Sequence, residues 1–91
     1  EDNFIYLDKT GALYLKEKKI KGVGIDALGI ERAQPEHETH KYLLESSIMI
    51  VEGLRLKHIK EGEYLLINLP LKINNVEAAP SRAILIKKEI N

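Results

Sequence analysis

The sequence has 91 residues, which is enough for one small domain with a modest hydrophobic core. Lys plus Arg and Asp plus Glu each number 14, so the zero formal charge gives no electrostatic reason to expect nucleic acid or an anionic membrane as a partner. The absence of cysteine excludes disulfides, thiolate metal sites and a cysteine nucleophile. Any metal site must therefore use carboxylates and the 3 histidines.

The sequence contains no membrane or export signal that we can identify. No run approaches the roughly 20 apolar residues that a membrane helix needs. The acidic start also lacks the basic-then-apolar order of a signal peptide. We therefore expect a cytoplasmic protein. Because the sequence begins with glutamate rather than methionine, we expect residue 1 to be an interior position of a longer gene product.

Short apolar runs separated by polar clusters predict alternating strands and short helices. In chain order the pattern predicts a strand at 4–7, a helix at 11–19, a strand at 20–26, a loop at 26–38, a helix at 39–46, a strand at 48–54, a turn at 56–62, a strand at 63–73, a loop at 74–81 and a strand at 82–90. We expect this order to form a mixed α/β sheet within a single partial domain, residues 1–91.

Side chains near the helix starts and inside one strand refine these predictions. Asp8 and Thr10 are expected to cap the first helix, and Thr39 is expected to cap the second. The buried stripe of the first helix is expected to be Ala12, Leu13 and Leu15 or Lys16. Pro70 should break its strand or place it at a sheet edge. Several strands are apolar enough to be buried on both faces, more than two short helices can cover, so we expect partners in the same chain or another.

His40 and Glu52 are the candidate metal ligands. Imidazole is the commonest metal ligand, although a histidine at the edge of a helix is more often a surface or capping residue. Glu52 follows four apolar residues, 48–51, where a buried carboxylate needs a cation, hydrogen-bond donors or solvent. Alternatively, the strand ends at Val51 and Glu52 faces water. The spacing of twelve residues is no local ligand motif, so only tertiary folding can bring the two together.

Three further polar residues are weaker candidates. Asp26 follows a strand with glycines, a place where ligands bind, but a loop aspartate more often bonds its own backbone. His37 is an alternative to His40, although it lies among charged residues and is expected to be solvated. His58 is expected on an exposed turn.

Four blocks of sequence, in order, carry a resemblance to a known family. They are GVGIDALGIE (22–31), HKYLLESSIMIVEGL (40–54), EYLLINLPLKI (63–73) and APSRAILI (79–86). Together they resemble the C-terminal half of the cyclase family, a metal-dependent group that includes kynurenine formamidase and isatin hydrolase. The resemblance implies the C-terminal half of that family's swivelling β/β/α fold.

The resemblance also implies a site and a chemistry. It places a metal-binding histidine at His40, which would be a ligand or position the attacking water, and a metal-binding glutamate at Glu52. The family's other motif, HxGTHxDxPxH, is absent from these 91 residues, and Gly29 stands where the family commonly has serine. The expected cofactor is a divalent metal, zinc or manganese, provided that the N-terminal motif is supplied.

Two functions follow as alternatives. The first is hydrolysis of a small-molecule amide, either an N-formyl aryl amide or a cyclic amide, by a metal-dependent enzyme of which this chain is the C-terminal part. The second is a non-catalytic α/β module of the same fold that serves assembly or ligand binding. The expected partners are the missing N-terminal half or a complementary chain, and further copies in a homo-oligomer. The chain alone is expected to be inactive.

Overall fold

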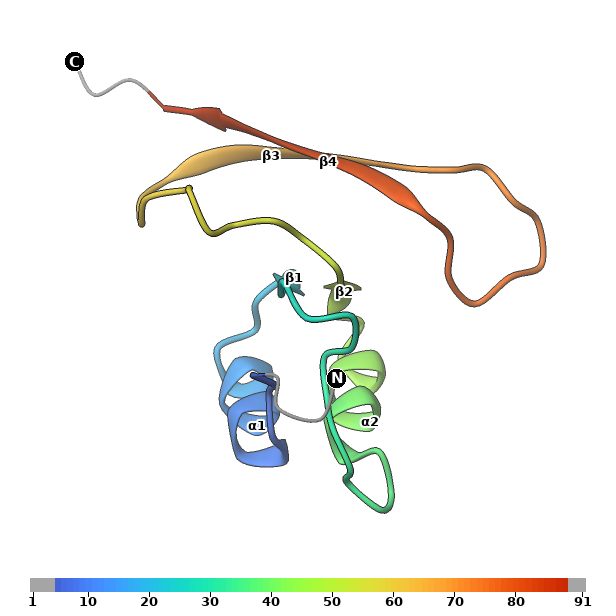
Figure 1. The fold of residues 1–91 in the computed structure, drawn as a ribbon. Coiled ribbons are helices and arrows are strands. Elements are labelled where there is room, and N and C mark those ends of the chain that lie inside the picture. The colour runs from blue at the N-terminus through green and yellow to red at the C-terminus, as the bar shows by residue number, and fades with distance from the viewer. Residues whose placement is uncertain (1–4, 89–91) are drawn as a thin grey trace. The chain divides into compact units, whose positions relative to one another are not determined.

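The computed structural model describes residues 5–88, and the chain forms one compact unit that ends at Lys57 and another that begins at His58. The helices and strands are α1 (Lys9–Glu17), β1 (Gly22–Gly24), α2 (Glu38–Glu45), β2 (Met49–Val51), β3 (Tyr64–Pro70) and β4 (Ser81–Lys87) (Figure 1). Within the described residues no helix is long and apolar enough to cross a membrane.

The N-terminal unit packs two helices and a small parallel sheet around an aliphatic core. β1 pairs with β2 in parallel, with Val23 opposite Ile50, and α1 lies beside α2 (Figure 1). The buried hydrophobic side chains are Ala12, Ile30, Leu43 and Ile48, each no more than 2% exposed. Because this core joins both helices to the loop between β1 and α2, it fixes the loop that carries part of the polar site.

Helix α1 begins where the sequence predicts a cap. The Asp8 carboxylate accepts a hydrogen bond from the Gly11 backbone N–H at 3.0 Å, which satisfies one of the amides that a helix start leaves unpaired. The Thr10 hydroxyl donates to the same carboxylate oxygen at 2.7 Å. The prediction of Asp8 as a cap is therefore confirmed, and Ala12 is buried as expected, whereas Leu13, also predicted to be buried, is 38% exposed.

The cap predicted for α2 is wrong, as is the first predicted strand. The N-cap residue is His37, in the left-handed region, and its side chain makes no capping bond. Thr39 lies inside the first turn and is fully buried. Its hydroxyl does not cap the helix but donates to the Leu7 carbonyl at 2.7 Å. The Leu7 N–H donates to the Ile30 carbonyl at 2.8 Å. The hydrogen-bonding groups of the Leu7 backbone are thus paired with a loop and a helix, and residues 5–7 form no strand. Phe4 lies outside the described residues.

The C-terminal unit is an antiparallel hairpin. β3 pairs with β4 from Tyr64 opposite Lys87 to Pro70 opposite Ser81. Pro70 ends its strand, as predicted from its missing N–H. Leu65 is 52% exposed in the chain alone, so burial of this hairpin on both faces stays a prediction that needs a covering partner. Parallel and antiparallel pairs thus occur together with short helices, which confirms the mixed α/β class, although the strands lie in two separate sheets.

Candidate functional site

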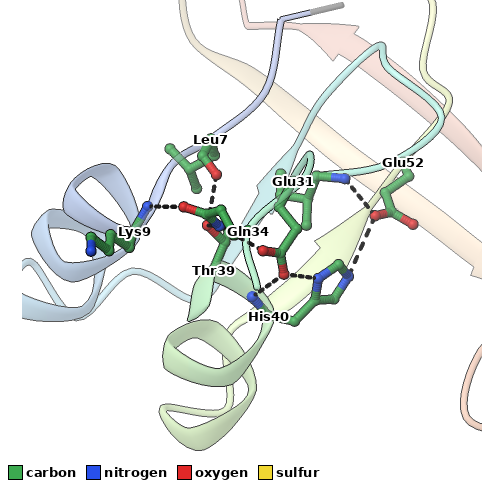
Figure 2. A network of polar contacts seen from close by, with 8 residues as sticks. Leu7, Lys9, Glu31, Gln34, Thr39, His40 and Glu52 are labelled. Carbon is green, nitrogen blue, oxygen red and sulfur yellow. Dashed lines mark hydrogen bonds and ion pairs between the residues drawn. The ribbon is translucent and has the colours of Figure 1, made fainter. Parts of the chain in front are cut away.

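The fold brings His40 and Glu52 together from two different elements. His40 lies in the first turn of α2, and Glu52 directly follows β2. The His40 Nε2 atom is 3.8 Å from Glu52 Oε2 (Figure 2). The two side chains are 38% and 34% exposed, so solvent reaches both. The separation is too long for a hydrogen bond, and the two polar atoms face each other without a direct contact.

A backbone amide holds the Glu52 carboxylate in place. The strand does end at Val51, but Glu52 does not simply face water, because its Oε2 atom accepts a hydrogen bond from the Ile30 N–H at 2.7 Å. Gly53, with φ of +70°, turns the chain immediately afterwards, and its N–H donates to the Ala27 carbonyl at 2.8 Å. The side chain is therefore oriented by the loop between β1 and α2.

Glu31 is the acidic residue of this site that the sequence did not single out. Its side chain is only 4% exposed, and Oε1 contacts the His40 Nδ1 atom and accepts from the His40 backbone N–H at 3.0 Å (Figure 2). Burial raises the pKa of this carboxyl, but the hydrogen bonds from His40 and Gln34 and the charge of His40 together bring the pKa below its ordinary value. The one signal in the sequence is its place directly after the apolar stretch that ends at Ile30.

Gln34 links this carboxylate to both helices. Its side-chain NH₂ donates to Glu31 Oε2 at 2.5 Å and to the Thr39 hydroxyl at 2.8 Å. Its carbonyl accepts from the Lys9 N–H at 2.9 Å, at the start of α1 (Figure 2). The network therefore ties the loop to α1 and α2, and the loop brings both carboxylates to His40.

The weaker candidates lie outside this network. The Asp26 carboxylate accepts from the Leu56 N–H at 3.0 and 3.1 Å, so it joins two loops rather than bonding its own backbone. The His37 ring lies edge-on to that of His40, with 6.5 Å between ring centroids, and His37 is exposed. His58 is exposed and belongs to the C-terminal unit.

The donors at His40 and Glu52 suit a divalent metal. Metal bonds of about 2.0–2.2 Å from an imidazole nitrogen and a carboxylate oxygen add up to slightly more than the 3.8 Å between these atoms, so one ion can reach both. Nitrogen with oxygen ligands fits zinc and manganese alike. Among residues 5–88 no group of three or more His, Cys, Asp or Glu side chains is placed to hold a metal.

Relatives found by sequence comparison align with most of the chain. No protein-family model matches. Cyclase-like protein 3 of Arabidopsis thaliana is 38% identical over 89 residues, which cover 96% of this chain and 33% of that protein. Kynurenine formamidase of Bacillus cereus is 35% identical over 75 residues, which cover 81% of this chain and 36% of that enzyme. The chain thus spans about a third of the length of either relative.

Two solved structures share the fold. One, described as a potential metal-dependent hydrolase with cyclase activity, has a TM-score of 0.91 and 50% identity over 96% of this chain and 43% of its own. The other, a predicted metal-dependent hydrolase from Bacillus stearothermophilus, has a TM-score of 0.90 and 50% identity over 93% of this chain and 42% of its own. The resemblance to the cyclase family is confirmed: the chain is similar in sequence to a cyclase-like protein and a kynurenine formamidase and shares the fold of the two hydrolase structures over the stretch that it spans.

Proposed function

We propose that the chain forms part of a metal-dependent amide hydrolase of the cyclase family, in which His40 and Glu52 bind a divalent metal. The observation that carries this proposal is the 3.8 Å approach of His40 Nε2 to Glu52 Oε2 at a solvent-accessible position. The relatives named kynurenine formamidase and the neighbours described as metal-dependent hydrolases support the reaction class. The substrate class is an N-formyl aryl amide or a cyclic amide.

The residues of this chain would hold the metal and orient its ligand atoms. His40 would offer its Nε2 lone pair and Glu52 its carboxylate, and the Ile30 N–H would keep that carboxylate from rotating away. A divalent metal bound there supplies an acidified water and a polarised amide carbonyl. Since both side chains are about one-third exposed, a small amide can approach without a movement of the core.

We propose that the remaining ligands come from a segment outside the described residues, in the same polypeptide or in a complementary chain. A catalytic zinc site normally has three protein ligands and a water, while this site contributes two. We also propose that the protein binds further copies of itself and forms a homo-oligomer. Zinc and manganese are the candidate metals.

The test measures bound metal and hydrolysis together, in the protein isolated with the segment or chain that supplies the remaining ligands. The variants are His40→Ala and Glu52→Gln, and His58→Ala is the matched control, because His58 is an exposed histidine of the other unit. We expect the wild type and His58→Ala to retain zinc or manganese and to hydrolyse an N-formyl aniline, and both site variants to lose metal and activity.

Two results would contradict the proposal. Metal retained equally by all variants would remove His40 and Glu52 from the ligand set. A metal-loaded wild type that hydrolyses neither N-formyl aryl amides nor cyclic amides would favour the alternative, a non-catalytic module of the same fold.

A further inference from the structure

We propose that Glu31 is the positioning residue of His40: its carboxylate accepts the Nδ1–H of the imidazole and thereby presents the Nε2 lone pair toward Glu52. This inference rests on the proposed metal site, in which that lone pair is a ligand. It assigns a role to a buried carboxylate that is neither a proposed ligand nor exposed to substrate.

The geometry fixes the ring through two contacts from one oxygen. Glu31 Oε1 accepts from the backbone N–H of His40 at 3.0 Å and contacts the Nδ1 atom of the same residue. The imidazole is thus held relative to its own backbone. Gln34 occupies the other oxygen at 2.5 Å, so rotation of the carboxylate would break bonds on both sides. With the Glu31 side chain 4% exposed, water competes little for these contacts.

The chemistry of the pair then selects one tautomer. An ionised carboxylate only accepts hydrogen bonds, and a neutral imidazole has one N–H and one acceptor nitrogen. The proton of neutral His40 must therefore sit on Nδ1, and the lone pair on Nε2. A carboxylate behind a metal-binding histidine both fixes this tautomer and increases the basicity of the ligand nitrogen.

Glu31 also has a structural role, and the experiment has to separate it from the positioning of the His40 ring. His40 is the third residue of α2, and its backbone N–H is one that the helix leaves unpaired. The side chain of the cap residue, His37, makes no capping bond, so Glu31 supplies the cap from the preceding loop. Loss of Glu31 will destabilise α2 whatever its effect on the ring. Asp8→Ala is the matched control, since it removes the cap of α1 without touching His40.

The first measurement is the nitrogen-15 spectrum of the His40 ring, without metal and at alkaline pH where the imidazole is neutral. We expect Nδ1 to carry the proton in the wild type and in Asp8→Ala. Glu31→Ala should shift the population toward the Nε2–H form that a free histidine side chain prefers. If that variant does not fold, Glu31→Gln, which keeps the volume, takes its place and should show a smaller shift in the same direction.

The second measurement is zinc titration of the same proteins by calorimetry. Removing a carboxylate that orients a ligand typically weakens metal binding by about 10- to 100-fold. We expect a loss in this range for Glu31→Ala, partial recovery in Glu31→Asp and no change in Asp8→Ala.

Failure of this inference differs from failure of the proposed function. A wild type that binds zinc, with a Glu31→Ala variant of equal affinity and unchanged tautomer, would overturn the role of Glu31 and leave the metal site intact. A wild type that binds no zinc, measured together with the segment or chain that supplies the remaining ligands, would overturn the metal site. In that case an unchanged tautomer in Glu31→Ala would also overturn the positioning role, and a changed one would support it.

Discussion

At the scale of single residues, Glu52 satisfies two requirements with one carboxylate. Its Oε2 atom accepts the Ile30 N–H at 2.7 Å, and the same oxygen is the one nearest to His40 Nε2. A carboxylate oxygen has two lone pairs, so the bond to Ile30 leaves one for a cation. The position of the side chain is therefore set by the fold and does not depend on a bound metal.

This division of roles predicts the behaviour of Glu52→Gln. The amide oxygen can still accept from the Ile30 N–H, but an uncharged acceptor forms the weaker bond. We expect the free energy of unfolding to fall by no more than about 1 kcal/mol, while metal binding is lost. Urea denaturation of the metal-free proteins measures the first quantity, and zinc titration measures the second. A large loss of stability with metal binding preserved would mean that Glu52 is structural.

The cap residue Asp8 predicts a dependence of stability on pH. The hydrogen bond from the Gly11 N–H, followed by that from the Thr10 hydroxyl, lowers the pKa of Asp8 below its ordinary value of 3.8. Because the pKa is lower in the folded chain, the stabilisation is fully present above pH 3.8 and is lost as the pH falls through the folded value.

The matched variant is Asp8→Asn, which keeps a capping side chain but does not titrate. We expect the wild type to be the more stable protein at neutral pH and its advantage over Asp8→Asn to shrink below pH 3.8 in thermal unfolding. An advantage that stays constant through this range would show that Asp8 titrates alike in the folded and unfolded chain.

At the scale of the elements, the sequence predicts the kinds of structure better than their ends. The short apolar runs around Val23 and Ile50 predict β1 and β2, but each strand is only three residues long. Thr39 has the side chain of a cap, and only the packing of Leu7 against α2 turns its hydroxyl inward. Contacts between residues far apart in the sequence decide such details, and a local pattern does not contain them.

The same limit applies to the site. His40 and Glu52 could be selected from the resemblance, because each has a fixed place in a family motif. Glu31 lies in a loop, directly after the short apolar stretch that ends at Ile30, and nothing local shows that its carboxylate turns inward to His40. Its role emerges only from the fold, which buries Ile30 and so brings the next residue under α2.

The turn after β2 predicts a cost for Gly53→Ala. Gly53 has φ of +70°, a conformation that L-residues rarely adopt, and an added Cβ would meet only Leu28 Cδ2, at an ordinary 3.9 Å. The effect thus comes from the backbone alone, and we expect a loss of about 1–2 kcal/mol in the free energy of unfolding. Gly62→Ala is the control, because its Cβ would meet only Tyr64, at 3.7 Å, with no positive φ. Equal stability of the two variants in urea denaturation would contradict the role of the turn.

At the scale of the whole molecule, burial is uneven along the described chain. Every buried residue between positions 5 and 88 belongs to the N-terminal unit. β3 and β4 instead expose large apolar side chains, namely Leu65, Leu66, Leu69, Ile84 and Ile86, each at least 39% exposed. A two-stranded hairpin is at best marginally stable by itself in water. The two units therefore have very different means of stabilisation.

This difference predicts two levels of hydrogen-exchange protection in the 91-residue chain. Backbone amides of α2 and of Ile48 should exchange slowly, because opening them exposes the core, whereas those of β3 and β4 should exchange much faster. Exchange followed by mass spectrometry at several protein concentrations makes the comparison. Equal protection in both units at low concentration would contradict the prediction. Protection of β3 and β4 that rises with concentration would support the proposed homo-oligomer, since a second copy would then cover the apolar side chains of the hairpin.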